Sequence, residues 1–124
     1  MITGGGSGIG KAIAKRFTDA GAAVVIVGRN KEKLESAAAE ISSPRLECMQ
    51  WDISDLSLCE SNFKRAAELI GGLDGFVNAA ALGSAVVTGR GYEPWDITEE
   101  EWDTLTDVNF KAAFFMMRNE VDFM

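Results

Sequence analysis

The residues with the clearest chemical signal form a glycine cluster near the start of the chain, Thr3-Gly4-Gly5-Gly6-Ser7-Gly8-Ile9-Gly10. Gly4 permits a tight turn after a strand, Gly8 lets the backbone approach a pyrophosphate, and Gly10 lets the following helix pack closely. Backbone N–H groups and the dipole of that helix would meet the phosphate oxygens. A flexible turn is the competing interpretation, but the position of the cluster between strand and helix favours a phosphate-binding loop.

Strands and helices must alternate around this loop. A first strand is expected to end at Thr3, two more cover 22–27 and 46–51, and a fourth begins at Phe76. The continuous apolar run at 22–27 is typical of a strand buried on both faces. Helices are expected from the glycine cluster to Gly21, from an Asn30 cap to Ser42-Ser43-Pro44, from 52–55 to Gly71, and from a capping box at Thr98 nearly to the chain end. This order predicts an α/β fold, a Rossmann-type doubly wound parallel sheet. The glycine-bearing stretch 79–97 is expected to be a functional loop.

Each expected helix carries apolar residues at helical spacing, which predict the buried faces. These are Ile9, Ala12, Ile13 and Phe17 in the first helix; Leu34, Ala37, Ala38 and Ile41 in the second; Leu58, Phe63, Ala66, Ala67 and Ile70 in the third; and Trp102, Leu105, Val108, Ala112, Phe115 and Met116 in the last.

Composition limits the function classes. The chain has 124 residues, 47% of them hydrophobic, which predicts one domain over 1–124. A net charge of -7 argues against nucleic-acid or anionic-membrane partners. The complete lack of histidine excludes Ser-His-Asp and Cys-His catalysis and histidine-ligated metals, and no metal site is expected. Cys48 and Cys59 are interpreted as reduced, packed thiols, and with no signal-peptide pattern at the start they indicate a cytoplasmic protein.

The spacing Thr3-Gly4-x-x-x-Gly8-x-Gly10 resembles the short-chain dehydrogenase/reductase (SDR) family rather than the common GxGxxG fingerprint. The resemblance implies a nicotinamide cofactor held by Thr3, Gly4, Ser7, Gly8, Ile9 and Gly10. Gly28 stands where an acidic residue would bind the ribose 2′-OH of NAD, and Arg29, followed by Asn30, suits a 2′-phosphate. NADP(H) is therefore expected over NAD(H). The alternative is that Arg29 is an ordinary solvated charge, since Ser7 leaves no second basic residue in the glycine loop.

Two later segments extend the resemblance. Asp52-Ile53 is similar to the family's adenine-contacting pair, although a solvated Asp52 capping the third helix is the competing interpretation. Asn78-Ala79-Ala80-Ala81 resembles the family's NNAG segment, with alanine in place of the second Asn and of the Gly. Asn78 is expected to brace the sheet and to line the cofactor channel. Ala79 and Ala80 are expected among the cofactor-binding residues, although no side-chain role of the second Asn carries over to Ala79.

Asn109 matches the family's helix asparagine, which implies that it holds a water in the proton relay behind the catalytic lysine, because an amide can both donate and accept. A solvated surface asparagine is the alternative. The aromatic and methionine stripe from Phe110 to Met117 is interpreted as core or subunit contact, and the resemblance implies a homo-oligomer.

The family's Tyr-x-x-x-Lys pair does not occur in this sequence. The one tyrosine, Tyr92, is followed by Glu93-Pro94-Trp95-Asp96. We therefore expect a fragment whose first strand and C-terminal strands are truncated, inactive and poorly stable alone, from an oxidoreductase that transfers hydride between NADP(H) and an alcohol or carbonyl substrate. A non-catalytic NADP(H)-binding module or gene remnant is the alternative, and a sugar-nucleotide site is a third, less favoured one.

Overall fold

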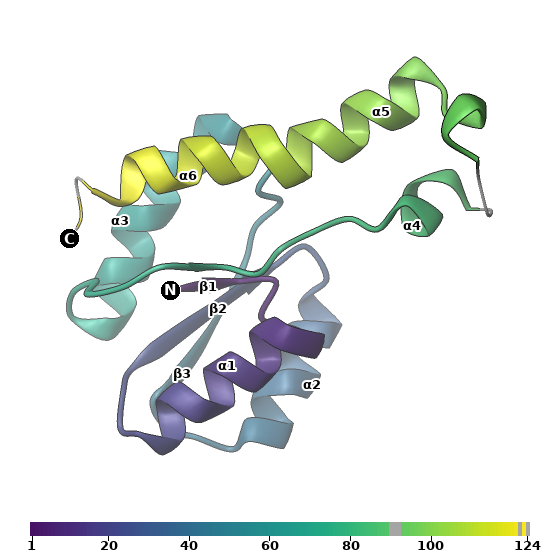
Figure 1. Cartoon of the computed structure of the whole chain (residues 1–124). Coiled ribbons are helices and arrows are strands. Elements are labelled where there is room, and N and C mark those ends of the chain that lie inside the picture. The colour runs from purple at the N-terminus through teal and green to yellow at the C-terminus, as the bar shows by residue number, and fades with distance from the viewer. Residues whose placement is uncertain (90–92, 122, 124) are drawn as a thin grey trace.

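The computed structural model describes residues 1–89, 93–121 and 123, so Tyr92 lies outside the described residues. Its described strands form one parallel sheet in the order β3-β2-β1-β4 (Figure 1). The strands are β1 (Ile2–Thr3), β2 (Val24–Gly28), β3 (Leu46–Gln50) and β4 (Val77–Asn78). Ile2 pairs with Ile26 on one side and with Val77 on the other. The predicted α/β fold with a parallel sheet is confirmed.

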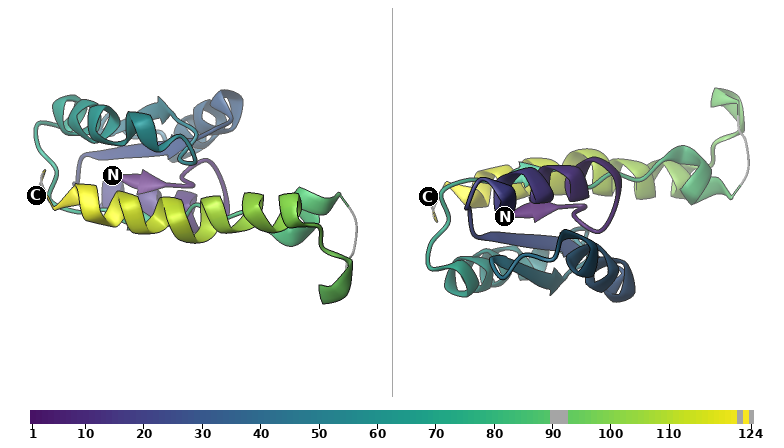
Figure 2. Two further views of the ribbon diagram at one scale, coloured as in Figure 1. Left: turned by 90° about the horizontal axis from the view of Figure 1, so that it is seen from above. Right: turned by 90° about the horizontal axis from the view of Figure 1, so that it is seen from below.

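Helices cover both faces of the sheet (Figure 2). α1 (Gly8–Asp19) and α2 (Lys31–Ile41) pack on one face, and α3 (Cys59–Ile70) packs on the other together with a long C-terminal helix. This long helix consists of α5 (Glu99–Thr106), the π-helical segment η3 (Asp107–Ala112) and α6 (Ala113–Glu120). The remaining short elements are η1 (Leu56–Leu58), α4 (Ser84–Thr88) and η2 (Pro94–Asp96). Among the described residues, no helix combines the length and apolarity needed to cross a bilayer.

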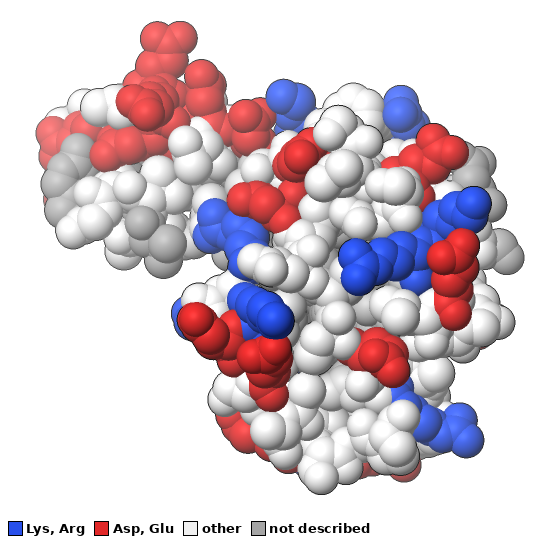
Figure 3. Space-filling model, turned by 180° about the vertical axis from the view of Figure 1, so that it is seen from behind, with Lys and Arg blue, Asp and Glu red and all other residues white. Residues whose placement is uncertain are grey.

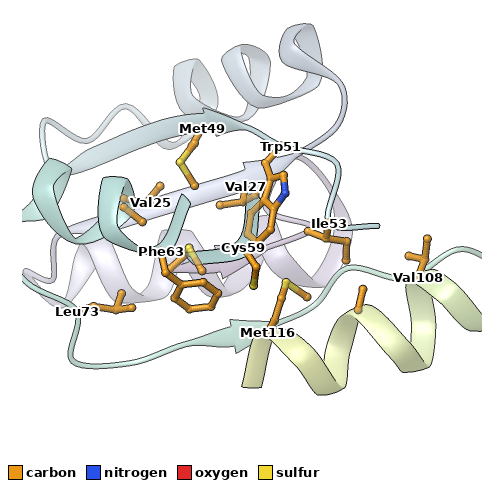
Figure 4. Close-up of a cluster of buried hydrophobic side chains, with 13 residues drawn as sticks. Val25, Val27, Met49, Trp51, Ile53, Cys59, Phe63, Leu73, Val108 and Met116 are labelled. Carbon is orange, nitrogen blue, oxygen red and sulfur yellow. The ribbon is translucent and has the colours of Figure 1, made fainter. Parts of the chain in front are cut away.

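Strand β2 divides the core into two halves because successive side chains point to opposite faces of the sheet. Val24 and Ile26 contribute to a cluster with α1 and α2, and Val25 and Val27 to a cluster with α3 and α6. Figure 4 shows the second cluster, in which Phe63 lies among residues of the sheet and both helices. The prediction of a strand buried on both faces is thus confirmed, with bounds two residues later at the start and one later at the end.

The predicted helix signals act as expected. The Asn30 side chain accepts a hydrogen bond from the Lys33 backbone N–H at 2.8 Å and so begins α2. Thr98 and Glu101 form the predicted capping box at the start of α5. Gly71 ends α3 with a left-handed backbone, φ +79°.

The predicted buried face of α1 is wrong for most of its residues, although Ile13 is half-buried against the core cluster on that side of the sheet. Ile9 is 76% and Phe17 45% exposed, whereas Gly10, Ala14 and Thr18 are the buried residues of this helix. At Gly10 the helix approaches the glycine loop so closely that a Cβ would collide with the Gly4 carbonyl oxygen, and the next inward positions carry the small residues Ala14 and Thr18. The spacing of the large apolar residues predicts a face with Ile9 and Phe17, whereas the face that packs on the sheet carries small residues.

Three further expectations need correction. Trp102 is 57% exposed, because burial along the last helix is confined to Val108, Ala112 and Met116. Leu58 is 45% exposed, because it lies in η1, before α3 begins. Cys48 is exposed on the edge strand β3, although its Sγ donates to the Leu34 carbonyl oxygen of α2 at 3.5 Å, while Cys59 is packed as expected.

Candidate cofactor-binding site

A cavity of about 890 Å³ opens at the carboxyl ends of the parallel strands. Between β1 and β4 the order of strands reverses, and crevices at such a switch point are where open α/β sheets bind ligands. Four segments that follow the four strands form the walls: Gly4 and Gly6–Ile9 after β1, Val27–Asn30 with Lys33 and Leu34 at β2 and α2, Trp51–Ile53 after β3, and Ala79–Leu82 after β4, with Val108 from η3.

The glycines of the loop have three different reasons to be glycine. Gly4 has φ +66°, and a Cβ there would lie 2.5 Å from the Ala79 carbonyl oxygen. A Cβ on Gly10 would lie 2.4 Å from the Gly4 carbonyl oxygen, so α1 and the loop are in direct backbone contact. Gly8 has φ +51° and no atom within 4 Å of its Cβ position, so the backbone there faces open space in the cavity wall. This open cradle fits a group that must approach the main chain.

The amino end of α1 supplies unused donors to the cavity. Ser7 precedes the helix, and its carbonyl accepts the first helical bond, from the Lys11 N–H at 3.2 Å. The N–H groups of Gly8, Ile9 and Gly10 lie before that bond and have no helical acceptor. The first turn carries no acidic residue. Ser7, Gly8 and Ile9 line the cavity, so this helix end can bind an anion there.

Charged side chains in the lining are few. Arg29 and Lys33 bring positive charge at the end of β2 and in the first turn of α2, and Asp52 is the one negatively charged residue among the described lining residues. The lining is thus net positive in a chain whose net charge is -7. Acidic residues gather instead around the start of α5, at Glu99, Glu100 and Glu101, and Figure 3 shows acidic side chains concentrated at that end of the molecule.

Asp52 is oriented by a short local turn. Its Oδ1 accepts hydrogen bonds from the Ser54 N–H at 3.1 Å and from the Ser54 hydroxyl at 2.8 Å. The competing interpretation, a cap of the third helix, is wrong: α3 has no side-chain cap, and the short η1 before it is capped by Asp55, whose Oδ1 accepts from the Ser57 N–H at 3.1 Å. Asp52 itself is exposed at the cavity wall, beside the buried Ile53.

Thr3 and Asn78 join the two strands that flank the switch point. The Thr3 hydroxyl donates to Asn78 Oδ1 at 2.6 Å and accepts from the Ala80 N–H at 3.3 Å. Thr3 is fully buried, and neither Thr3 nor Asn78 lines the cavity. Both therefore act as braces that position the cavity walls rather than as part of the lining.

Asn109 holds the loop after β4. Its Oδ1 accepts from the Leu82 N–H at 2.7 Å, and its Nδ2 donates to the Leu82 carbonyl at 2.9 Å. The side-chain amide thus satisfies both backbone groups of one residue, 27 positions away in the sequence. It lies in the π-helical segment η3, beside the cavity-lining Val108. A water contact of Asn109 stays a prediction.

Most residues predicted for the site do gather there. Ten line the cavity: Gly4, Ser7, Gly8, Ile9, Arg29, Asn30, Asp52, Ile53, Ala79 and Ala80. Thr3, Gly10, Asn78 and Asn109 support its walls from outside the lining. Lys33, Trp51, Leu82 and Val108 are lining residues that the sequence interpretation missed. No sequence motif marks Lys33, because its place in the lining depends on how the glycine loop packs against the first turn of α2.

The two thiols have no role in this cavity. Burial raises the pKa of the Cys59 thiol, and the positive charge of Arg118 lowers it by a smaller amount. For Cys48, desolvation is the larger cause of a raised pKa, and the negative charges of Glu47 and Glu35 raise it further. Both are free cysteines. In the part of the chain that the structure describes, no group of three or more cysteine or carboxylate side chains could hold a metal ion.

Comparison with known proteins gives one consistent family. A family model described as short chain dehydrogenase matches residues 1–124. An uncharacterized oxidoreductase of Staphylococcus aureus is 35% identical over 119 residues, which cover 95% of this chain and 48% of the relative. The chain therefore spans about half the length of the curated relatives it matches.

Solved structures share the fold. A 3-ketoacyl-(acyl-carrier-protein) reductase from Brucella melitensis, complexed with NADH, is similar with a TM-score of 0.87 and 33% identity over 98% of this chain and 48% of that one. A short-chain dehydrogenase of the glucose/ribitol dehydrogenase type from the same organism has a TM-score of 0.86 and 26% identity over 99% of this chain and 50% of that one.

Proposed function

Because this chain belongs to the short-chain dehydrogenase family, we propose that residues 1–124 are the NADP(H)-binding part of an oxidoreductase. The observation that carries the proposal is a single cavity that gathers the open amino end of α1, the cations after β2 and the Asp52 carboxylate after β3. These are the chemical partners of a dinucleotide: donors for a pyrophosphate, cations for a further phosphate, and an acceptor for an adenine amino group.

Each part of the cofactor has a matching wall. The Gly8 backbone and the N–H groups of the first turn of α1 would hold the pyrophosphate. Asp52, already oriented by Ser54, would accept from the adenine amino group, with Ile53 beside it. Ala79 and Ala80 line the wall toward the reacting end. The cofactor, when bound, would supply hydride chemistry.

NADP(H) is proposed over NAD(H) on account of charge. Gly28 lines the cavity without a side chain, so no carboxylate stands at the end of β2 to bind a free ribose hydroxyl or to repel a phosphate. Arg29 follows directly, and a guanidinium suits a phosphate through charge-assisted hydrogen bonds.

The reaction proposed for the whole protein is hydride transfer between NADP(H) and an alcohol or carbonyl compound. A homo-oligomer is proposed as well, because Phe110, Phe114 and Met117 are exposed on the side of the last helix away from the core. The free thiols of Cys48 and Cys59 fit a reducing compartment, which supports a cytoplasmic setting as part of the same proposal.

Isothermal titration of the full-length gene product with NADPH, NADH and UDP-glucose tests the cofactor. We expect NADPH to bind at least tenfold more tightly than NADH, and UDP-glucose not to bind. Oxidation of NADPH at 340 nm with a panel of ketones and aldehydes tests the reaction. Equal affinity for the two dinucleotides would overturn the NADP(H) preference, and binding without oxidation of any substrate would overturn the enzyme assignment.

A further inference from the structure

Lys33 lies at the wall of the candidate cofactor cavity, although no sequence motif singles it out. It is the third residue of α2, and its backbone N–H is fixed by the Asn30 cap at 2.8 Å. A Cβ placed on Gly6 would lie 3.4 Å from the Lys33 carbonyl carbon and Cβ. The glycine loop therefore packs against the first turn of α2, and Lys33 is held between that loop and the cavity.

The charge of Lys33 is available to a ligand. Lys31, two residues earlier, pairs with Glu35 at 3.6 Å, and Lys11 on α1 pairs with Glu40 at 2.7 Å. Across the described residues, 1–89, 93–121 and 123, no carboxylate lies within ion-pair distance of the Lys33 ammonium. A cation that lines a cavity and has no carboxylate partner favours an anionic ligand.

Arg29 faces a different electrostatic environment. It borders the main cavity and also a second cavity of about 430 Å³, whose lining includes Glu100 and Glu101. Those carboxylates reduce the positive potential that Arg29 offers to an anion. Lys33 borders the main cavity and is not part of the lining of the second one. Among the described lining residues of the main cavity, Asp52 is the one carboxylate, and it already accepts two hydrogen bonds from Ser54.

We propose that Lys33 is a specificity-determining residue that binds the 2′-phosphate of NADP(H) together with Arg29. This inference rests on the proposed cofactor and names the residue that selects it. An ammonium is a compact point charge on a flexible stem, so Lys33 can adjust to the phosphate while the planar guanidinium of Arg29 fixes its direction. The amino end of α2, which Asn30 begins, favours an anion at the same place.

The test compares Lys33→Gln with Lys31→Gln in the full-length gene product. Both residues lie in the first turn of α2, but Lys31 pairs with Glu35 and does not line the cavity. We expect Lys33→Gln to weaken NADPH binding about tenfold, the loss of one charge-assisted hydrogen bond, and to leave NADH binding unchanged. Lys31→Gln should leave both affinities within about twofold, and both variants should melt within a few degrees of the parent protein.

Small ligands separate the possible failures. The parent protein should bind 2′,5′-ADP more tightly than 5′-ADP, and Lys33→Gln should abolish most of that difference. If the parent protein prefers NADPH but Lys33→Gln keeps the full preference, the role of Lys33 is wrong while the proposed cofactor stands. If the parent protein shows no preference for NADPH or for 2′,5′-ADP, the NADP(H) assignment and the role of Lys33 both fail.

Discussion

Substituting Gly8 by alanine separates the phosphate-binding role of this backbone from its conformational role. Gly8 and Gly21 lie just inside the start and just past the end of the same helix, α1. Both have positive φ, +51° and +91°, and at both a Cβ would have no atom within 4 Å. An alanine at either site therefore costs only backbone strain, about 1–2 kcal/mol. We expect Gly8→Ala and Gly21→Ala to lower the free energy of unfolding by similar amounts.

Ligand binding should distinguish the two variants. Gly8 lines the cavity, and its methyl group would occupy the open space that a phosphate must enter, whereas Gly21 lies outside the cavity. Loss of one hydrogen bond from a backbone N–H to a charged phosphate costs roughly 1.5–3 kcal/mol, or roughly 10- to 150-fold in affinity. Chemical denaturation and calorimetric titration of the full-length protein with NADPH measure both quantities. Equal loss of NADPH affinity in Gly8→Ala and Gly21→Ala, or unchanged affinity in Gly8→Ala, would refute this reasoning.

Three further predictions concern other parts of the molecule. Asn109→Ala removes both hydrogen bonds to the Leu82 backbone and should cost about 1–3 kcal/mol in urea denaturation and weaken NADPH binding. Asn109→Asp keeps the bond from the Leu82 N–H but turns a carboxylate oxygen toward the Leu82 carbonyl oxygen, so it should destabilise the protein as well, and full stability in both variants would contradict this role of Asn109. Because burial raises the pKa of Cys59, its thiol should resist iodoacetamide at neutral pH in the folded protein, and fast labelling of Cys59 in mass spectrometry would contradict this. The unfolded chain ionises this thiol at a lower pH than the folded protein does, so the contribution of Cys59 to the free energy of unfolding should fall as the pH rises past the ordinary thiol range. Phe114→Asp, on the exposed face of the last helix, should shift sedimentation of the protein toward smaller species without a change in NADPH affinity, and an unchanged sedimentation coefficient would contradict the proposed contact.

The order of elements could be predicted because each signal is local. The capping residues Asn30 and Thr98 satisfy backbone groups three residues away, and the apolar run of β2 reflects burial on both sides of one strand. The glycine loop was equally accessible to sequence reasoning, since Gly4, Gly8 and Gly10 are required by backbone conformation or by close contact. Sequence reasoning therefore predicts those features that depend on the conformation or burial of a few residues close together in the chain.

The inner face of α1 and the role of Asn109 could not be predicted for the opposite reason. Gly10 and Ala14 are buried because a loop and a strand approach the helix closely, and periodicity does not report how close two elements lie. Asn109 bonds the backbone of Leu82, and a backbone partner has no side-chain identity that a motif could record. Lys33 was missed because its significance depends on the missing carboxylate partner and on the cavity beside it, both of which are tertiary features.

The alanines at 79–81 show why departures from the family's NNAG segment need not damage the cavity. Ala79 contacts the glycine loop through its carbonyl oxygen, which would lie 2.5 Å from a Cβ on Gly4, and Ala80 is tied to Thr3 through its N–H. Both contacts use the main chain, which alanine supplies as well as asparagine does. The side chains that hold this wall are the Thr3 hydroxyl, at Ala80, and the Asn109 amide, at Leu82. The wall after β4 therefore depends on backbone position, and the side-chain groups that hold it come from β1 and from the helix that follows it in the chain.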